Sequence, residues 1–420
     1  FIYKMYRQCK HVVKSINSLK VKLMSTGPLN NIRIVDMTRI LAGPFCSMIL
    51  SDLGAEIIKI EQPGTGDETR NWGPPFVNNE SCYFLSVNRN KKSVTLNFKS
   101  PAGQKIIKQL LEKSDVLLEN FLPGTLAKYN LDYQSISKTH PHIIYCSISG
   151  YGSNGPYWKK PGYDVIVASL GGLLNVTGPT DGDPCKVGVA MTDIATGLYA
   201  HGAILAALIE RSKTNEGQFI DCNLLSSQVS CMVNIASNYL NAGKLGSRWG
   251  TAHESIVPYQ SFKTQDGFIT IGAGSNLQFQ DLCAKLCVPT LGEDAKFSTN
   301  SMRVQNRNEL IAFLECIFAK KPTDYWLQLF KDCTFTFSPI NNMKQVFEDP
   351  QVIHSELSRE VNHPTTGSIK VVGPAVKYSK SVNSVRFAPP TLGQHTFEVL
   401  SDLLGLSVDH LTDLQNKKII

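Results

Sequence analysis

The sequence predicts an α/β protein built on a parallel, doubly wound sheet. Short runs rich in Ile, Val and Leu alternate with segments whose apolar residues recur at helical spacing, and loops rich in Gly, Pro, Asn and Arg separate them. Strands that alternate with helices in this way usually pair in parallel, because each crossover helix returns the chain to the same edge of the sheet. A chain of 420 residues is also long enough for two domains.

The elements of the first half follow one another in strand–helix order. The predicted strands span residues 32–36, 55–60, 115–119, 142–147 and 218–222. Between them we expect helices at 45–53, at 101–111 and near 193–211. The second of these begins with Ser100 as a cap and Pro101 in the first turn, the two residue types favoured there.

The pattern of strand and helix signals differs between about residue 241 and residue 347. A strand at 268–274 runs into a Gly turn, and helices are expected at 310–318 and 325–331. We therefore assign 236–345 to a small domain, and 28–235 with 346–420 to a large domain that ends in a turn and a helix at 389–404.

Four loops follow the carboxyl ends of predicted strands. They span residues 38–44, 62–70, 120–124 and 149–156. Ligands bind at this edge of a doubly wound sheet because the loops converge there. Ordinary turns use the same residue types, so no single loop is evidence of a site, but together they indicate a binding crevice.

Basic residues are concentrated at the start of the chain. Six of the 42 Lys and Arg lie in residues 1–30, which contain no acid, and the remaining basic residues nearly balance the 35 acidic ones. A nucleic-acid-binding surface is therefore not indicated. An acid-free, basic, Ser-containing start is typical of a mitochondrial targeting peptide, here residues 1–27, although a basic tail has the same composition.

The sequence lacks the usual signals of membrane proteins, metal sites and several nucleotide-binding or hydrolytic enzymes. The longest apolar stretch, 194–209, is too short to span a bilayer, so no membrane contact is expected. The eleven cysteines include no C-x-x-C pair, and no histidine lies near enough to the closest pair, Cys283 and Cys287, to complete a metal-ligand motif, which predicts reduced, mostly buried thiols and no metal site. Two G-x-G sequences, at Gly64 and Gly272, lack the third glycine of a dinucleotide-binding loop, and the P-loop, G-x-S-x-G and H-E-x-x-H motifs are missing.

Asp193 has two readings. It precedes an apolar helix, which on sequence alone favours the role of an N-cap. A carboxylate there is also a candidate nucleophile, kept ionised by the helix N-terminus. Four lysines have a similar ambiguity, between contact with phosphates and a solvated surface: Lys91, Lys92, Lys99 and Lys128.

An ordered series of short motifs runs from Asn31 to about Leu404. It comprises Leu41-Ala-Gly-Pro44, Leu53-Gly-Ala-Glu-Ile-Ile-Lys-Ile-Glu61, Gly66-Asp-Glu-Thr-Arg70, Asn90-Lys-Lys-Ser93, Glu119-Asn-Phe-Leu-Pro-Gly124, Ser149-Gly-Tyr-Gly152, Gly162-Tyr-Asp164, Asp193-x-x-x-Gly197, Gly217-Gln218 and Pro389-Pro-Thr-Leu-Gly-Gln-His-Thr396. Each motif alone is unspecific. As an ordered set they resemble the class III CoA-transferase family, the formyl-CoA transferase-like proteins.

The resemblance implies a fold and an activity. The fold would be a large Rossmann-like domain and a smaller α/β domain, in a homodimer whose chains are interlocked. The activity would use CoA thioesters as substrates, with no permanently bound cofactor and no metal. The chain looks most similar to the mitochondrial-matrix branch, which transfers CoA from succinyl-CoA to glutarate or 3-hydroxy-3-methylglutarate through an aspartyl-CoA intermediate, carried here by Asp193.

The resemblance also implies site residues. Those expected at the CoA site are Ile40, Leu41, Ala42, Gln62, Leu96, Lys99, Asn120, Phe121 and Lys128. Gln62 and Lys128 stand where several relatives have Arg, so the contacts of these two with the nucleotide are expected to be weaker.

Further residues are expected around the reacting groups. Arg39 and Arg89 are candidates for the distal carboxylate of the acid, with a structural ion pair as the alternative for each. Backbone N–H groups of Gly272, Ala273 and Gly274 are candidates for stabilising an oxyanion. His253 fits the same branch of the family, although by itself it favours a structural role.

Two other functions remain open. The related 2-methylacyl-CoA racemases have a histidine directly after the glycine that matches Gly162, where this chain has Tyr163, a poor base near neutral pH. A non-catalytic CoA-binding protein on the same fold is the second alternative.

Overall fold

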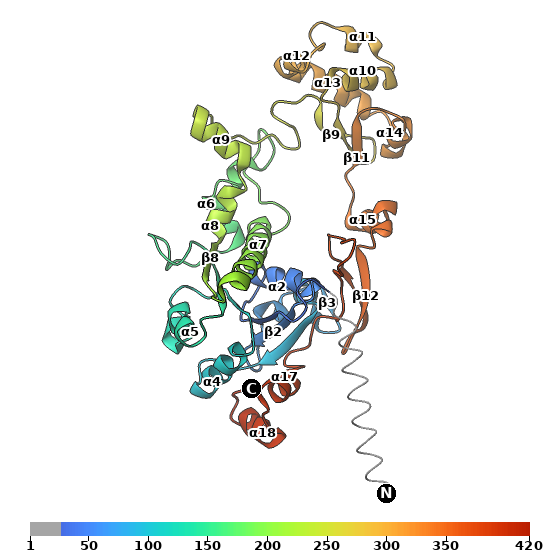
Figure 1. Ribbon diagram of the computed structural model, residues 1–420. Coiled ribbons are helices and arrows are strands. Elements are labelled where there is room, and N and C mark those ends of the chain that lie inside the picture. The colour runs from blue at the N-terminus through green and yellow to red at the C-terminus, as the bar shows by residue number, and fades with distance from the viewer. Residues whose placement is uncertain (1–26) are drawn as a thin grey trace. The chain divides into compact units, whose positions relative to one another are not determined.

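The computed structural model describes residues 27–420, which form two compact units (Figure 1). The first unit runs to Gly171 and also contains Gly188–Val233 and Ile353–Ile420; the second contains Gly172–Val187 and Asn234–Val352. The segment 172–187, placed by the sequence in the large domain, clusters with the second unit. Apart from Gly27, the predicted targeting peptide lies outside the described residues.

A six-stranded sheet forms the centre of the first unit, and every neighbouring pair of its strands is parallel. The strands are β1 (Arg33–Asp36), β2 (Glu56–Glu61), β5 (Lys91–Thr95), β6 (Val116–Glu119), β7 (Ile144–Ser149) and β8 (Phe219–Asn223). Their order, β5-β2-β1-β6-β7-β8, is the 3-2-1-4-5-6 order of Rossmann-type sheets. The parallel α/β class is confirmed, and only β5 was not predicted, because it opens with two lysines.

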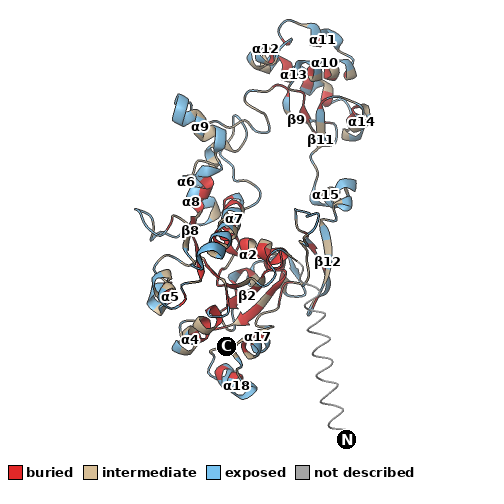
Figure 2. Ribbon diagram, viewed as in Figure 1, coloured by how far each residue is buried: buried red, intermediate tan, exposed pale blue. Residues whose placement is uncertain are grey.

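Helices cover both faces of this sheet, because neighbouring strand residues point to opposite faces. Ile34 packs in one apolar core with residues of α2 (Ala42–Asp52), α6 (Asp164–Leu170), α7 (Met191–Thr214) and α8 (Leu224–Ser230). Val35 packs in the other core with residues of α4 (Pro101–Leu111), α5 (Tyr133–Thr139), α17 (Thr396–Leu404) and α18 (Val408–Asn416). Figure 2 shows the buried residues concentrated in the sheet and in the helix faces turned toward it.

Smaller elements complete the first unit. They are η1 (Glu68–Asn71), the β3–β4 pair (Phe76–Val77, Glu80–Ser81), α3 (Cys82–Val87), η2 (Leu126–Tyr129) and the β12–β13 hairpin (Ser358–His363, Gly367–Val372). Leu85 of α3 packs against Ile369 and Val371 of the hairpin.

The second unit contains an antiparallel sheet rather than a second parallel one. Its strands, β9 (Tyr259–Lys263), β10 (Phe268–Gly272) and β11 (Thr336–Pro339), are ordered β11-β10-β9. The sheet shares an apolar core with α10 (Asn276–Lys285), α13 (Arg307–Phe318) and α14 (Thr323–Leu329). Further helices lie in the second unit or at its boundaries. They are η3 (Leu174–Val176), α9 (Val233–Ala242), α11 (Pro289–Glu293), α12 (Asn300–Gln305), α15 (Met343–Glu348) and α16 (Pro350–His354).

Helix α7 is longer than its apolar stretch suggested. Its 24 residues include an 18-residue stretch with a mean hydropathy of 1.3, so the helix is long and apolar enough to cross a membrane by length and composition. One such helix is weak evidence for a membrane, since core helices of globular proteins meet the same criterion. In the first unit α7 packs against α2, α8, β7 and β8, as the covering helix of an α/β sheet does.

The cysteines of the described chain are all free thiols. Cys46, Cys146, Cys222 and Cys283 are buried, but four others are exposed, so the expectation of mostly buried thiols was wrong.

Candidate active site

Asp193 lies in the first turn of α7 but does not cap the helix. The N-cap position is Ala190, which supplies no side-chain hydrogen bond. Asp164, the first residue of α6, does this work instead: its Oδ1 accepts the backbone N–H of Thr192 at 2.8 Å and that of Asp193 at 3.2 Å. The predicted N-cap role of Asp193 was therefore wrong, and its own carboxyl is left free for chemistry.

The carboxyl of Asp193 is half-buried and has an unusual affinity for protons. Burial, together with the negative charge of Asp164, raises the pKa of Asp193 from 3.8 to about 7. Within residues 27–420, no side chain donates a hydrogen bond to this carboxyl. The sequence had suggested that the helix N-terminus keeps the group ionised, whereas burial and Asp164 favour its protonated form. A carboxylate with few stabilising partners is a stronger nucleophile than a solvated one, provided that it is ionised.

Gly197 lets α7 approach the start of α2. A Cβ built on Gly197 would lie 2.7 Å from the backbone oxygen of Ala42 and 3.1 Å from Cδ1 of Phe45. Asp193 and Gly197 are four residues apart and therefore share one face of α7. The face that carries Asp193 is thus packed against the first turn of α2.

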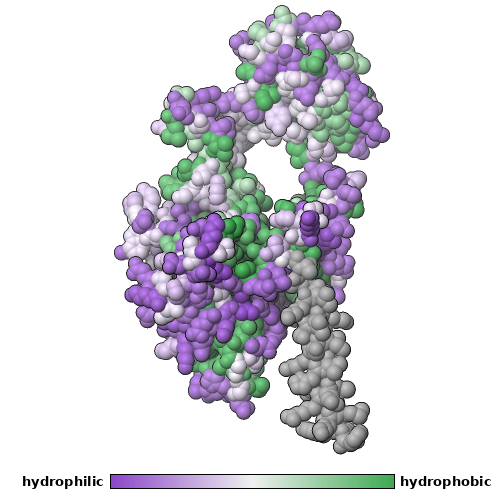
Figure 3. Space-filling view, viewed as in Figure 1, coloured by the Kyte–Doolittle hydropathy of each residue, from purple (hydrophilic) through white to green (hydrophobic). Residues whose placement is uncertain are grey.

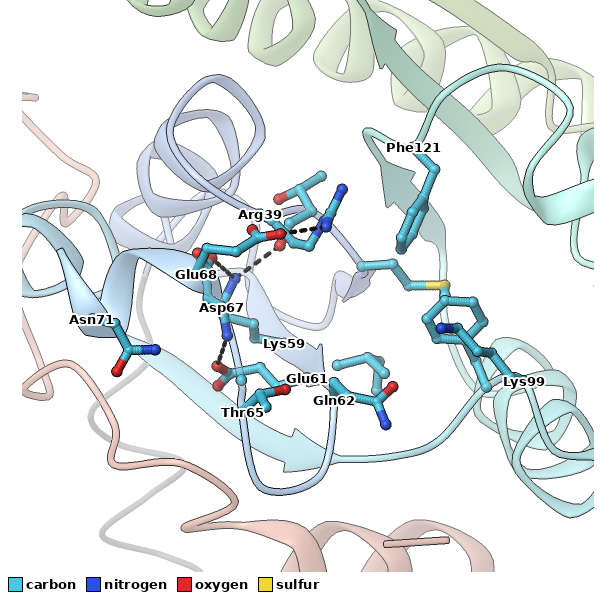
Figure 4. A pocket seen from close by; sticks show the side chains of 15 residues that line it. Arg39, Lys59, Glu61, Gln62, Thr65, Asp67, Glu68, Asn71, Lys99 and Phe121 are labelled. Atoms are coloured by element: carbon cyan, nitrogen blue, oxygen red, sulfur yellow. Dashed lines mark hydrogen bonds and ion pairs between the residues drawn. The ribbon is translucent and has the colours of Figure 1, made fainter. Parts of the chain in front are cut away.

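A pocket of about 280 Å³ opens at the carboxyl edge of β1 and β2, in the same unit (Figure 4). Its lining residues are Met37, Thr38, Arg39, Lys59, Ile60, Glu61, Gln62, Thr65, Gly66, Asp67, Glu68, Asn71, Phe98, Lys99 and Phe121. Four of them, Arg39, Gln62, Lys99 and Phe121, were named from the sequence. The pocket lies beside the carboxyl ends of the neighbouring strands β1 and β6. The strand order reverses between these two strands, and ligands bind at such points in doubly wound sheets.

The acidic residues of the pocket are neutralised by neighbouring cations. Asp67 pairs with Lys59 at 2.9 Å, Glu68 with Arg39 at 2.6 Å, and Glu61 with Arg70 at 2.7 Å. The pairing with Lys59 lowers the pKa of Asp67 to about 2, even though burial opposes it. Carboxylates here therefore do not exclude an anionic ligand.

One side of the pocket combines aromatic rings with a free cation. Phe98 contacts Phe121 and Tyr129 edge-on, with ring centroids 5.3 and 5.5 Å apart. Figure 4 shows Phe121 and Lys99 together on the side opposite Asn71. No acidic group of the described chain pairs with Lys99. Aromatic faces beside an unpaired ammonium suit a purine base and phosphates.

Other residues expected at the CoA site fall into three groups. Ile40 follows Thr38 and Arg39 in the turn that leads from the pocket, Leu41 and Ala42 begin α2, and Asn120 binds the backbone of the turn at Arg39. Lys128 is exposed on η2 and does not line the pocket. Leu96 is fully buried in the apolar core and is not among the residues that line this pocket.

Arg89 is committed elsewhere. Its side chain is 5% exposed and binds Asp52 through two nitrogens, Nε at 3.0 Å and Nη2 at 2.5 Å. This geometry favours the structural ion pair over the role of substrate anchor. Lys91 is likewise buried, at 3.5 Å from Asp36, and is not a solvated surface residue. Arg39, which lines the pocket, remains the candidate for a substrate carboxylate.

The glycine segment predicted to stabilise an oxyanion lies in the second unit. Gly272 ends β10, and Ala273 is fully buried with its N–H donated to the carbonyl of Pro258 at 3.0 Å. Ala273 is therefore corrected to a structural residue. The buried Arg303 holds the Gly274 carbonyl at 2.9 Å, and Gly274 is the remaining candidate donor of the three.

Two predicted residues have contrasting surroundings. Tyr163 precedes α6, directly before Asp164, and is 60% exposed. In the second unit, Nδ1 of His253 accepts the N–H of Ser255 at 3.1 Å, and its ring lies 5.7 Å from that of Tyr259. These contacts are those of a structural histidine.

Sequence reasoning missed three charged residues that shape this site: Lys59, Asp67 and Asp164. A lysine in the middle of the apolar strand Glu56–Glu61 was a usable signal, because a buried lysine needs a partner. Asp164 stood within a recognised motif but had been given no role. Within residues 27–420, no group of three or more His, Cys, Asp and Glu is arranged to hold a metal ion.

Comparisons with known proteins agree with this geometry. Residues 29–396 match the family described as CoA-transferase family III. The chain is 56% identical to a succinyl-CoA:glutarate CoA-transferase of Mus musculus, over 90% of this chain and 87% of that protein, and 55% identical to the human protein of the same name, over 90% and 86%. It is also 38% identical to a succinate–glutarate CoA-transferase of Agrobacterium fabrum, over 90% and 96%.

Solved structures give the same answer. The crystal structure of a CAIB/BAIF family protein from Brucella suis has a TM-score of 0.82 to this chain and is 38% identical, covering 90% of this chain and 100% of that one. The motifs, the parallel sheet and these relatives lead to one conclusion: the chain is an enzyme that belongs to CoA-transferase family III.

Proposed function

We propose that this enzyme moves CoA from succinyl-CoA to a dicarboxylic acid, glutarate or 3-hydroxy-3-methylglutarate, with Asp193 as the covalent nucleophile. The names of the relatives carry the choice of substrates, since the mouse, human and Agrobacterium proteins are all named for succinyl or succinate and glutarate. The half-buried carboxyl of Asp193, which receives no side-chain hydrogen bond from the described residues, carries the choice of nucleophile.

The reaction needs two exchanges at one carboxyl. The Asp193 carboxylate attacks the thioester carbonyl of succinyl-CoA, which forms a mixed anhydride and releases CoA thiolate. The thiolate attacks the aspartyl carbonyl, leaving aspartyl-CoA and free succinate. Glutarate then repeats these steps in reverse and leaves as glutaryl-CoA. An anhydride and a thioester are both activated acyl groups, so each step is reversible without ATP.

The pocket beside β1 and β2 supports the binding half of this proposal. Phe98 and Phe121 offer faces for the adenine, and Lys99 offers an unpaired charge for a phosphate. The guanidinium of Arg39 lies 5.0 Å from the centre of the Phe121 ring and is 40% exposed at the pocket, where it is a candidate partner for an anionic group. All of these residues belong to the unit that carries Asp193.

The quaternary structure and location are also proposed. Apolar side chains of the first unit are exposed on α6 and α7, among them Ile166 (54%), Leu170 (53%), Leu198 (47%) and Ile209 (62%). Figure 3 shows apolar residues gathered over this region. Such an area supports a homodimer, which by resemblance to the family would be interlocked, and light scattering would detect it at twice the chain mass of 46.4 kDa. The basic start supports a mitochondrial location, tested by imaging a fusion of residues 1–30.

A hydroxylamine trap tests the nucleophile directly. The enzyme is incubated with succinyl-CoA and hydroxylamine, digested, and mapped by mass spectrometry. A hydroxamate on Asp193 is the expected result; a hydroxamate elsewhere, or an active Asp193→Asn variant, would contradict the assignment. Asp221→Asn, which replaces a carboxyl on β8 of the same unit, is the control. This variant should still form the hydroxamate on Asp193.

The same preparation separates the alternatives. Formation of glutaryl-CoA from succinyl-CoA and glutarate is the outcome expected of a transferase. Binding of CoA without any exchange would favour a non-catalytic binder. Loss of chirality at a 2-methylacyl-CoA would favour a racemase, which the exposed Tyr163 does not support.

A further inference from the structure

The turn between β1 and α2 is held in an unfavourable backbone conformation. Ile40 has φ 71°, in the left-handed region, which a β-branched residue rarely adopts. Such conformations persist only where the surroundings enforce them, and they are concentrated at functional sites. The neighbouring Thr38 and Arg39 line the pocket, and Leu41 leads into the helix packed on α7. The turn therefore connects the pocket to the helix face that carries Asp193.

Side chains bind the backbone of this turn from both sides. Asp36 accepts the N–H of Thr38, and Asn120 bridges both the N–H and the carbonyl of Arg39. Two further backbone groups are bound by Lys59 and Asp67: Lys59 Nζ donates to the Thr38 carbonyl at 2.8 Å, and the Asp67 carboxylate accepts the N–H of Ile40 at 3.2 and 3.3 Å.

Lys59 and Asp67 form one fully buried pair. Both side chains are 0% exposed, and Nζ of Lys59 lies 2.9 Å from Oδ2 of Asp67. Thr69 donates its backbone N–H and its hydroxyl to Oδ1 of Asp67 and fixes that carboxylate. A buried pair of this kind contributes little net stability, so its presence indicates a specific structural task.

We propose that the Lys59–Asp67 pair is a positioning device that locks the Thr38–Ile40 turn in the geometry needed to bind the CoA thioester. Neither residue acts on the substrate chemically; both act through the turn. The inference rests on the proposed function in placing CoA in this pocket.

The sign of the effect separates positioning from simple electrostatics. CoA is a polyanion, so removal of a carboxylate beside its pocket should tighten binding if charge alone matters. Loss of a positioning carboxylate should instead weaken it. Because Asp67→Asn alone would leave Lys59 as an uncompensated buried charge, the informative variant is Lys59→Met/Asp67→Asn, which removes both charges together. This variant leaves the net charge beside the pocket unchanged, so charge alone predicts unaltered binding, whereas loss of positioning predicts weaker binding.

The test measures the Kd of CoA by calorimetry, with the thermal unfolding midpoint recorded for each protein. The double variant should bind CoA about tenfold more weakly, since small displacements of positioning groups have large effects. Adding Ile40→Gly should recover at least about threefold, because glycine adopts a positive φ without steric cost. Glu56→Gln is the control: it removes a carboxyl at the start of the same strand, which is 32% exposed and neither lines the pocket nor binds the turn, and binding should stay equal.

Three results would overturn the inference. Unchanged or tighter binding by the folded double variant shows that the pair does not position the turn. If the double variant binds more weakly and adding Ile40→Gly does not improve its binding, the pair acts by another route. Lys99→Met, run in parallel, reports on the pocket itself: if it leaves Kd unchanged, CoA binds elsewhere and the proposed CoA site fails as well. If Lys99→Met weakens binding and the double variant does not, only the positioning role fails.

Discussion

The raised pKa of Asp193 predicts an acid limb near neutral pH in the rate of transfer. Only the ionised carboxylate can attack a thioester, and kcat/KM reports the ionisation of the free enzyme. With a pKa of about 7, roughly nine-tenths of the enzyme is reactive at pH 8, half at pH 7 and one-tenth at pH 6. With the ordinary value of 3.8, more than about 99% would be reactive at pH 6. The two cases therefore differ about tenfold at pH 6.

The assay is kcat/KM for succinyl-CoA between pH 5 and 9, followed by the appearance of glutaryl-CoA. Asp164→Asn keeps an oxygen that can accept the N–H groups of α7 but removes the negative charge beside Asp193. The acid limb should therefore move to lower pH in this variant. Asp132→Asn, at the N-cap position of α5 in the opposite helix layer, is the matched control and should leave the limb in place.

A rate at pH 6 within about twofold of that at pH 8 would refute this reasoning, provided that circular dichroism shows the fold intact at both. An acid limb that Asp164→Asn does not move would remove Asp164 from the explanation and leave burial alone.

Further predictions concern packing, binding and stability. Gly197→Ala should destabilise the protein by about 1–3 kcal/mol in urea unfolding, because the added Cβ meets the backbone of α2 at 2.7 Å, whereas Gly202→Ala, with nothing within 4 Å, should be neutral or stabilising. Equal effects at the two sites would contradict this packing. Lys99→Met should weaken CoA binding by about tenfold and Lys105→Met, on the exposed side of α4, should not; calorimetry decides. Asp193→Asn should raise the unfolding temperature more at pH 8 than at pH 5. The native carboxyl keeps its proton to about pH 7 and the unfolded one loses it near 3.8, so its destabilising effect grows between these values; an equal rise at both pH values would count against it.

The parallel sheet was predictable because its signals are local. Ile34 and Val35 are both apolar and point to opposite faces, as expected of a strand covered on both sides. The start of helix α4 was predicted from Ser100, whose hydroxyl accepts the N–H of Gly103 at 3.0 Å. Strand β5 was not predicted, because its first residue, Lys91, is buried beside Asp36. These two residues are 55 positions apart, so a short stretch of sequence does not reveal that they pair.

The candidate site was predictable in part. Resemblance to the family identified Gln62, Lys99 and Phe121, and the structure groups them with Arg39 because all four follow strands whose carboxyl ends meet. Arg89 precedes β5 and Leu96 directly follows it, and the side chains of both are buried in the interior, where the surrounding packing decides what they contact. Motif resemblance identifies positions along the chain and not the directions of side chains.

The sequence by itself determined the family, the parallel α/β class and the position of Asp193, because these depend on residue type, spacing and order. Only the tertiary structure decided which charges meet. It placed Asp164 on the first turn of α7, raised the pKa of Asp193 and buried Lys59 against Asp67. Each of these depends on the distance between atoms that are remote in the chain and on the water excluded around them, and neither quantity is written in the order of the residues.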